Sequence, residues 1–456
     1  MNIYLIVEIA LRELDSKILL ATLAAARGHQ VIISEQNIIR RSLKNGALDP
    51  GIFHTKSLTP NNNKIALHQS LIDYGFKITS LDEEGSLIDH GYEMFARNRY
   101  SEKMMEFTSA VFGWGTEDVE TLKRYYPRYS SKIYKTGSPR ADLWKLFFFD
   151  YWGLPSMAPR KPYLLVSSNM KAYSIQPFYN VMEFHKNAGY YQRDPGLLKK
   201  QLGIASESFT LTADFIEAIK YLARKNNGYD IVLRPHPTEK IEPWKISLEN
   251  IPNVHIIREG SITSWVNNAF AVMHNGCTTA LEATFSKKPV LTYVPFKQDF
   301  ARKLPNELGH RIETLEELLL EANNLFTASK TSNYKDANNT LPEIISKKIY
   351  FDSNELAAEK IIKLWENLDN GSLSKTFKMK KFQLFLKVAN IRNIIGNLLR
   401  KFNSGKFNST KEDWKFPPLD QDDIRERVTR LKHILKIDVE LECKLISDRT
   451  ILIRRS

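Results

Sequence analysis

The sequence is poor in cysteine and has no long hydrophobic run. Its 456 residues include two cysteines, Cys277 and Cys443, which stand in neither a CxxC nor a Cys/His spacing. This argues against a disulfide scaffold and a structural zinc site, and it indicates a reducing compartment such as the cytoplasm. No uncharged run approaches the roughly 18 residues of a membrane-spanning helix. Because Glu8 interrupts the first apolar segment, we expect no signal peptide either.

Two common nucleotide-binding signatures are also missing. The chain has neither a GxxxxGK[ST] loop nor a GxGxxG fingerprint, so ATPase chemistry and classical NAD chemistry lack support. No clear DxD motif stands at the candidate site positions, and we therefore expect no metal and no resident cofactor. The spacings of helix-turn-helix and zinc-finger proteins are absent, so we expect no nucleic-acid partner.

The sequence does contain enough apolar material for two or three cores, since 43% of its residues are hydrophobic. Short apolar runs alternate with amphipathic stretches, which is typical of βα units around a parallel sheet. The alternation pauses in a proline-containing stretch and restarts at Tyr163. We predict an α/β protein with two doubly wound Rossmann-like domains, residues 1–155 and 156–370, facing across a cleft. Residues 371–456 would form a basic amphipathic helical extension, with a helix and a short strand at its end.

The positive charge is concentrated in one segment. The chain has 65 Lys and Arg against 52 Asp and Glu, a net charge of +13. Residues 371–415 hold eleven of these cations and two acidic residues, so they carry +9 and the remainder carries +4. Apolar residues are interspersed, as in amphipathic helices on anionic membranes, where each cation contributes about 1 kcal/mol. This predicts a peripheral protein on the inner face of the cell membrane. The alternative is a helix that packs its apolar side on the protein's own core.

In the second domain, polar residues follow the predicted strands. Arg234 and His236 come directly after one strand, where their side chains could present cations to a phosphate. The next such segment, HNGCTTALEA, has a glycine turn and hydroxyls at the start of a helix, which is typical of a phosphate site. Its candidate ligands to a nucleotide sugar are Asn275, Gly276, Thr278, Thr279 and Glu282, and after an earlier strand Ser167 and Ser168. The threonines could instead only cap the helix.

In the first domain, ionisable residues gather at two strand ends. Asp82, Glu83 and Glu84 precede Gly85 after a predicted strand, a place where a general base could face the cleft. A solvated acidic turn is the alternative interpretation. Glu8 and Arg12 follow the first strand, and we assign them to the acceptor side of the site.

These motifs resemble a known enzyme class. Glu83-Glu84-Gly85, His236-Pro237 and Thr278-Thr279 resemble the D/E-D/E-G, HP and S/T-S/T motifs of bacterial sialyltransferases and other CMP-sugar glycosyltransferases of the GT-B fold. More closely, residues 1 to 310 resemble the surface carbohydrate (polysaccharide) biosynthesis proteins, a GT-B-like family. The segments that carry this second resemblance are VEIALRELDSKILLA, SLDEEG, FGWG, KTGSPRADLW, RPHP, HNGCTTALEA and PNEL.

The resemblance implies a metal-independent transferase acting on a CMP-sugar, a nonulosonic acid or Kdo, and a surface polysaccharide or glycolipid acceptor. It implies that a carboxylate, most directly Glu83 or else Glu84, activates the acceptor. It also implies that His236 assists departure of CMP while Thr278 and Thr279 bind its phosphate. The third motif, Thr278-Thr279, departs from the family, in which serine is commoner than threonine. Three alternatives remain: a UDP- or CDP-linked sugar or polyol-phosphate transferase, a nucleotide-sugar epimerase, and a non-catalytic membrane-surface scaffold.

Overall fold

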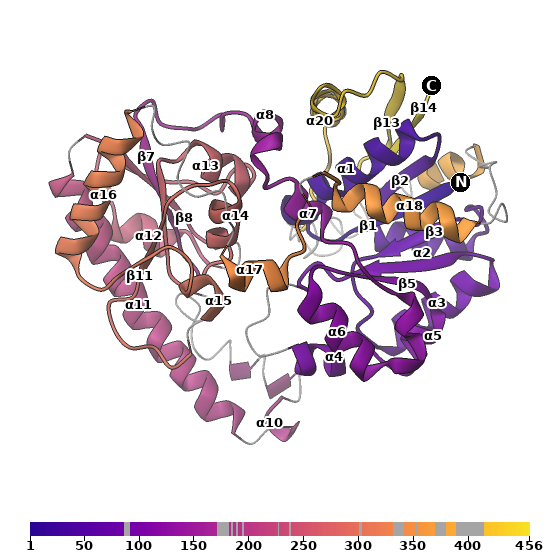
Figure 1. Cartoon of the computed structure of the whole chain (residues 1–456), viewed down its shortest axis with the longest axis horizontal. Coiled ribbons are helices and arrows are strands. Elements are labelled where there is room, and N and C mark those ends of the chain that lie inside the picture. Colours follow the sequence, from indigo (N-terminus) through magenta and orange to yellow (C-terminus); the bar gives the residue numbers. More distant parts are fainter. Residues whose placement is uncertain are drawn as a thin grey trace, which may run out of the picture. The chain divides into compact units, whose positions relative to one another are not determined.

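The structure is a computed structural model, and it describes residues 1–85, 92–170, 182–183, 186–187, 190–193, 196–226, 228–236, 239–300, 303–331, 342–352, 354–369, 380–388 and 415–456. The chain forms two compact units (Figure 1). Unit 1 comprises Met1–Leu143 and Glu343–Ser456, and unit 2 comprises Trp144–Pro342.

Unit 1 is built on an eight-stranded sheet in the order β13-β14-β2-β1-β3-β4-β5-β6. Its strands are β1 (Asn2–Val7), β2 (Gln30–Glu35), β3 (Ile52–Thr55), β4 (Lys77–Leu81), β5 (Thr108–Gly113), β6 (Ile133–Lys135), β13 (Leu441–Ser447) and β14 (Thr450–Arg455). The first six strands are parallel, and every residue of β1 is buried, as expected for a central strand covered on both faces. The chain leaves β1 for β2 on one side and returns to β3 on the other, so the topological switch point lies between β1 and β3.

Helices follow these strands in the order that the alternation predicts. Those of unit 1 are α1 (Ala10–Ala26), α2 (Gln36–Lys44), α3 (Asn62–Asp73), α4 (Tyr92–Arg99), α5 (Glu102–Phe107), α6 (Thr116–Tyr125), η1 (Pro127–Lys132), α7 (Pro139–Asp142), α17 (Glu343–Lys348), α18 (Ala357–Asp369) and α20 (Gln421–Ile434). α1 is rich in Ala and Leu and ends before Gly28, whose φ of 88° is the left-handed conformation that glycine adopts without strain. Side chains of α2 to α6 and of the sheet form one continuous core.

The C-terminal part of the chain belongs to unit 1. Trp365 of α18 is fully buried and donates from Nε1 to Thr79 Oγ1 of β4 at 3.0 Å. β14 pairs antiparallel with β2 and extends the sheet, and Arg427 of α20 contacts Asp15 of α1 at 2.7 Å. The unit boundaries therefore differ from the predicted domain ends at residues 155 and 370, because the returning chain buries its apolar side chains on the first sheet.

The basic extension is described in part. Residues 380–388 are helical, and Phe382 and Leu386 are buried in the core of unit 1 while Leu384 is exposed. This described segment therefore packs its apolar side on the protein's own core. Residues 371–379 and 389–414 lie outside the described residues, and membrane attachment through 371–415 stays a prediction. No helix within the described ranges has the length and hydrophobicity to cross a membrane.

Truncation of Leu386 tests the packing of this helix. Because the side chain is 5% exposed in the unit 1 core, we expect Leu386→Ala to lower the free energy of unfolding by about 2 kcal/mol. Leu384→Ala is the matched control, since Leu384 is 63% exposed on the same helix and its truncation should cost less than about 0.5 kcal/mol. Denaturant unfolding of the full chain measures both variants. Equal, small effects would contradict the packing.

Unit 2 contains a six-stranded parallel sheet in the order β12-β11-β10-β7-β8-β9. The strands are β7 (Tyr163–Ser167), β8 (Asp230–Arg234), β9 (Val254–Ile256), β10 (Ala271–His274), β11 (Val290–Tyr293) and β12 (His310–Ile312). The chain runs from β7 to β8 and β9 on one side and then crosses to β10 on the other. The switch point of this sheet therefore lies between β7 and β10.

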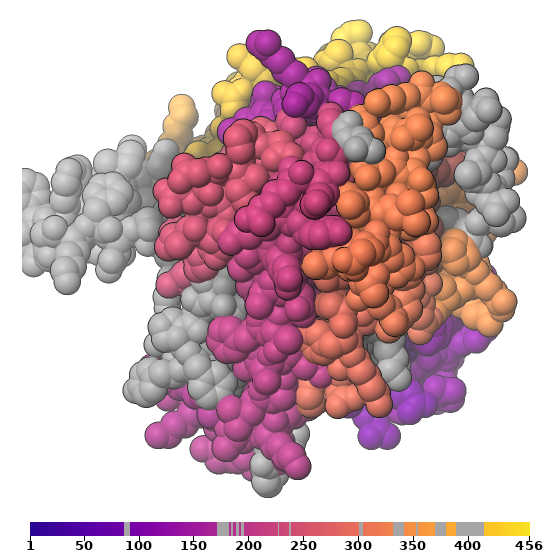
Figure 2. All heavy atoms as spheres, turned by 90° about the vertical axis from the view of Figure 1, so that its left-hand side faces the viewer, coloured from indigo at the N-terminus to yellow at the C-terminus, as the bar shows by residue number. Residues whose placement is uncertain are grey.

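The helices of unit 2 precede, separate and follow its strands. They are η2 (Leu146–Phe148), α8 (Phe149–Trp152), α10 (Tyr190–Arg193), α11 (Leu197–Lys225), α12 (Glu242–Ser247), α13 (Ile262–Asn268), α14 (Thr279–Phe285), α15 (Lys303–Asn306) and α16 (Leu315–Ser329). α11 and α16 lie side by side on the face shown in Figure 2, and both contribute buried side chains to the core beneath. The predicted fold class, α/β with two Rossmann-like sheets, is confirmed.

Candidate functional site

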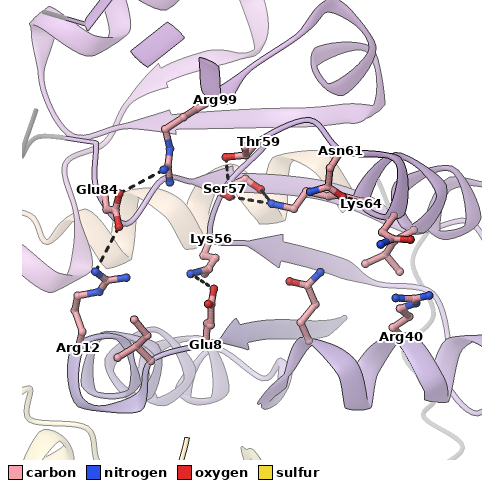
Figure 3. A pocket seen from close by; sticks show the side chains of 14 residues that line it. Glu8, Arg12, Arg40, Lys56, Ser57, Thr59, Asn61, Lys64, Glu84 and Arg99 are labelled. Atoms are coloured by element: carbon pink, nitrogen blue, oxygen red, sulfur yellow. Dashed lines mark hydrogen bonds and ion pairs between the residues drawn. The ribbon is translucent and has the colours of Figure 1, made fainter. Parts of the chain in front are cut away.

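A polar pocket of about 440 Å³ lies in unit 1 at the switch point between β1 and β3 (Figure 3). Its volume falls in the range of small-molecule sites, and switch points are where ligands bind in open parallel sheets. The lining comes from the segments that follow β1, β2, β3 and β4 and from α4. The lining residues are Glu8, Ile9, Arg12, Gln36, Arg40, Lys56, Ser57, Thr59, Asn61, Asn63, Lys64, Leu67, Glu84 and Arg99.

The acidic motif forms a tight turn directly after β4. Asp82 is buried, and its carboxylate accepts two hydrogen bonds from Arg99 at 2.8 and 2.9 Å. Its carbonyl accepts a hydrogen bond from the indole of Trp114, a fully buried residue of the FGWG motif. A Cβ at Gly85 would lie 2.7 Å from the Trp114 ring, so only glycine fits there. The turn is therefore fixed by contacts that the sequence motifs FGWG and DEEG supply together.

Glu83 points into the protein. It is 3% exposed, and its Oε1 accepts a hydrogen bond from Lys17 Nζ of α1 at 2.6 Å. Burial would raise the pKa of Glu83, but the charge and hydrogen bond of Lys17, with Arg140 and Arg12, outweigh it and lower this pKa. Oε2 has no hydrogen-bond partner among the described residues. Glu83 is thus an ionised carboxylate held in a buried ion pair.

Glu84 points the other way, into the pocket (Figure 3). Its side chain is 48% exposed, and its two oxygens lie 3.5 Å from Arg12 Nη1 and 3.3 Å from Arg99 Nη1. The three neighbouring carboxylates therefore differ in environment: Asp82 anchors the turn, Glu83 is buried, and Glu84 is the one that a ligand in the pocket can reach.

Glu8 and Arg12, the predicted acceptor-side residues, both line the pocket. Glu8 is paired with Lys56 and with Lys415, the latter at 3.0 Å. Burial would raise the pKa of Glu8, but these two ammonium groups outweigh it and lower the pKa to about 2. Arg12 also contacts the buried Glu13 at 3.1 Å. Glu13 in turn accepts the backbone N–H of Glu8 at 2.8 Å, which fixes the loop after β1.

Sequence reasoning missed most of the cations of this pocket. Lys56 and Lys64 stand on either side of the loop between β3 and α3, and Arg40 lies on α2. Lys64 donates to the carbonyl and hydroxyl oxygens of Ser57 at 3.0 and 2.9 Å. Each of these residues reads as an ordinary surface cation in the sequence. The only available signal was that all follow strands that a doubly wound sheet places together.

In unit 2, the segments after β7 and β10 meet at the switch point. The Ser167 hydroxyl lies 3.0 Å from Thr279 Oγ1 and 3.1 Å from Cys277 Sγ. The Asn169 amide donates to the carbonyl of Gly276 at 2.6 Å. The structure thus brings together the predicted residues Ser167, Gly276 and Thr279, with Ser167 and Thr279 hydrogen-bonded to each other and buried.

The turn after β10 has one hydroxyl, that of Thr278, that takes part in none of these hydrogen bonds. Gly276 has a φ of 60°, and its N–H donates to Asn306 Oδ1 of the PNEL motif at 2.6 Å. Asn275 donates to the carbonyl of Tyr293 at 2.7 Å. Thr278 precedes α14, is partly exposed, and makes no side-chain cap on that helix. Thr278 is therefore the hydroxyl of this turn that is available to a ligand.

The segment after β8 contains Arg234 and His236. Arg234 is buried, and its guanidinium donates to the carbonyls of Glu259 and Gly260, the second at 2.8 Å. Burial is the main cause that lowers the pKa of Arg234 to about 10. His236 is partly exposed, and its backbone N–H donates to Ser168 Oγ at 3.4 Å. Pro237, the second residue of the HP motif, lies outside the described residues.

Two further carboxylates of unit 2 are buried. Glu282, a predicted ligand to the nucleotide sugar, is 2% exposed and accepts a hydrogen bond from Thr263 at 2.7 Å. Glu239 was not singled out in the sequence. It accepts from the Ser168 hydroxyl and from the N–H of Met170, each at 2.8 Å, and so fixes the loop after β7. Within the described parts of the chain, no three His, Cys, Asp or Glu side chains are grouped as metal ligands.

No protein-family model matches the chain. No curated protein matches it in sequence.

Solved structures do match it in fold. One is a putative UDP-N-acetylglucosamine 2-epimerase from Listeria monocytogenes, with 14% identity and a TM-score of 0.48 over 81% of this chain and 97% of that one. Another is UDP-GlcNAc 2-epimerase from Neisseria meningitidis bound to UDP-GlcNAc, with 12% identity and a TM-score of 0.44 over 80% and 100%. A third is the wall teichoic acid polymerase TagF, with 12% identity and a TM-score of 0.41 over 71% and 74%.

Proposed function

We propose that this chain is a nucleotide-sugar-dependent enzyme of glycan biosynthesis. More specifically, we propose a glycosyltransferase that moves a nonulosonic acid or Kdo from a CMP-sugar to a surface polysaccharide or glycolipid. The observation that carries the proposal is the turn after β4. It buries Asp82 and Glu83 and presents Glu84 to a 440 Å³ pocket at a switch point. A carboxylate so placed can act as a general base.

We assign the donor to the switch point of unit 2. The Thr278 hydroxyl at the start of α14 supplies a donor to the CMP phosphate, and His236 stands at the neighbouring strand end. Ser167 and Thr279 are buried in mutual hydrogen bonds, and we give them the role of shaping the turn. Arg234 and Glu282, which are bound to groups of their own unit, likewise position the surrounding loops.

In the proposed reaction, an acceptor hydroxyl attacks the anomeric carbon of the donor. The bond between that carbon and the phosphate oxygen breaks, and its electron pair leaves with CMP. Glu84 takes the proton of the attacking hydroxyl, and His236 and Thr278 stabilise the charge that develops on the phosphate. The products are the extended glycan and CMP.

Nucleotide binding tests the donor assignment. We expect CMP at 100 times its dissociation constant to raise the free energy of unfolding by about 2.7 kcal/mol, measured as a thermal shift. Thr278→Val should weaken CMP binding about tenfold, the value of one hydrogen bond to a charged group. Thr210→Val is the control, because Thr210 is exposed on α11 and its hydroxyl bonds its own helix.

The same experiment separates the alternatives. Stabilisation by UDP but not by CMP would contradict the CMP-sugar donor and would favour a UDP-linked transferase or an epimerase. An absence of stabilisation by any of CMP, UDP and CDP would contradict the enzyme and would favour a membrane-surface scaffold.

A further inference from the structure

The pocket of unit 1 has more positive than negative charge. Five cationic side chains line it, and they are Arg12, Arg40, Lys56, Lys64 and Arg99. Two carboxylates line it, Glu8 and Glu84. A pocket with this excess favours an anionic ligand over a neutral one.

Ion pairs with neighbouring carboxylates neutralise part of this excess. Arg12 pairs with Glu13, Lys56 with Glu8 and Glu13, and Arg99 with Asp82. Arg40 and Lys64 are different, because neither has a carboxylate within 4.0 Å anywhere in the portion of the chain that the structure describes. In Figure 3, Arg40 lies on the side of the pocket away from Arg12 and Glu84, while the Lys64 side chain extends to Ser57, between Arg40 and Arg99.

The pKa of Lys64 reflects its surroundings in the pocket. Burial, followed by the charge of Lys56, lowers the pKa of Lys64 to about 8. Asp82 and Glu8 act in the opposite direction but do not outweigh these effects, and a bound anion would add to their influence.

The rest of the lining suits a sugar. Ser57, Thr59, Asn61, Asn63 and Gln36 contribute hydroxyl and amide groups, which donate to and accept from sugar hydroxyls. The volume of about 440 Å³ exceeds that of a lone phosphate and accommodates a monosaccharide with a charged substituent. Glu84 stands at the end opposite to Arg40, and Lys64 lies between them, so a ligand held by these two cations would extend toward the carboxylate.

We infer that this pocket binds a sugar carrying an oxyanion, a phosphate or a carboxylate, with Arg40 and Lys64 as its charge partners. The inference rests on the proposed function for one point only, that the bound sugar is the acceptor whose hydroxyl Glu84 activates. It adds to that function the chemical class of the acceptor, which is an anionic glycan residue.

The test is calorimetric titration of the full chain, without donor, with four probes: glucose 6-phosphate, glucuronate, glucose and inorganic phosphate. We expect at least one of the charged sugars to bind at least tenfold more tightly than glucose and than inorganic phosphate, and its affinity to fall as salt rises. Tighter binding of glucose 6-phosphate assigns a phosphate, and tighter binding of glucuronate assigns a carboxylate. Equal affinities for charged and neutral sugars would overturn the inference.

Variants connect binding to the two named cations. Arg40→Gln and Lys64→Gln should each weaken binding of the charged sugar at least tenfold. Arg41→Gln is the matched control, since Arg41 is the next residue of α2, is exposed and does not line the pocket. If Arg41→Gln weakened binding as much as Arg40→Gln, the pocket would not be the site.

CMP binding to the same variants separates this inference from the proposed function. We expect Arg40→Gln and Lys64→Gln to bind CMP as the wild type does. A chain that binds CMP but no charged sugar would refute the inference and leave the proposed donor standing. A chain that binds a charged sugar but no nucleotide would refute the proposed function and leave the anion pocket standing.

Discussion

Replacement of Glu84 by Gln is expected to lower kcat by about 10² to 10⁴-fold, the usual contribution of a positioned general base. The substitution keeps the shape of the side chain and removes the charge that accepts the proton. Stability should change by less than about 1 kcal/mol, because Glu84 is half-exposed and its ion pairs with Arg12 and Arg99 lie at the protein surface. CMP release from a CMP-sugar in the presence of acceptor measures the effect.

The control for this variant is Glu93→Gln. Glu93 is an exposed glutamate that pairs with Arg124 at 2.9 Å, so its replacement also removes one surface ion pair. We expect kcat of Glu93→Gln to equal that of the wild type. An unchanged kcat for Glu84→Gln would show that the carboxylate at the pocket is not the base and would contradict the role proposed for Glu84.

Replacement of Lys17 by Met is expected to have the largest effect on stability, a loss of about 3 to 5 kcal/mol. Lys17 is 1% exposed and its ammonium is 2.6 Å from Glu83, so Met leaves a carboxylate buried without its main partner. Denaturant unfolding at pH 7 measures this loss. The double variant Lys17→Met with Glu83→Leu should recover most of it, because replacing both charges by apolar groups of similar size is often neutral.

The pH dependence provides a second check on this pair. In the wild type the pKa of Glu83 is lowered, so its ion pair stabilises the fold above the unfolded-state pKa and is lost as the pH falls. Without Lys17, burial dominates and raises this pKa, so protonation at lower pH relieves the buried charge. The stability difference between Lys17→Met and wild type should therefore be smaller at pH 5 than at pH 7. A constant difference would argue against an ionised Glu83.

The sequence by itself determined the two sheets and the strand ends that carry the candidate residues. The alternation of buried strands and amphipathic helices is a local property, and it remained correct for β1, β8 and β10 and for the helices that follow them. Polar residues directly after such strands must lie at the carboxyl edge of a parallel sheet. That is why Glu8, Glu84, His236 and Thr278 could be named before their surroundings were known.

The division of the chain into units depended on long-range contacts. Nothing local to residues 343–369 or 415–456 distinguishes a helix that stays in the second domain from one that returns to the first. Burial of Trp365 beside β4 and pairing of β14 with β2 place both segments in unit 1. The tertiary structure also decided which strand neighbours which, and so which loops share a pocket.

The orientation of the three carboxylates likewise depended on contacts with distant parts of the chain. Asp82, Glu83 and Glu84 are adjacent and chemically alike, and the motif resemblance that favoured Glu83 carries no information on which of the three is buried. Arg99, Lys17 and Trp114, each at least 15 residues away along the chain, fix the turn and direct one carboxylate to the pocket. The sequence therefore determined where the acidic motif lies in the sheet. Only packing and charge from distant segments determined that Glu83 is buried and Glu84 is open to a ligand.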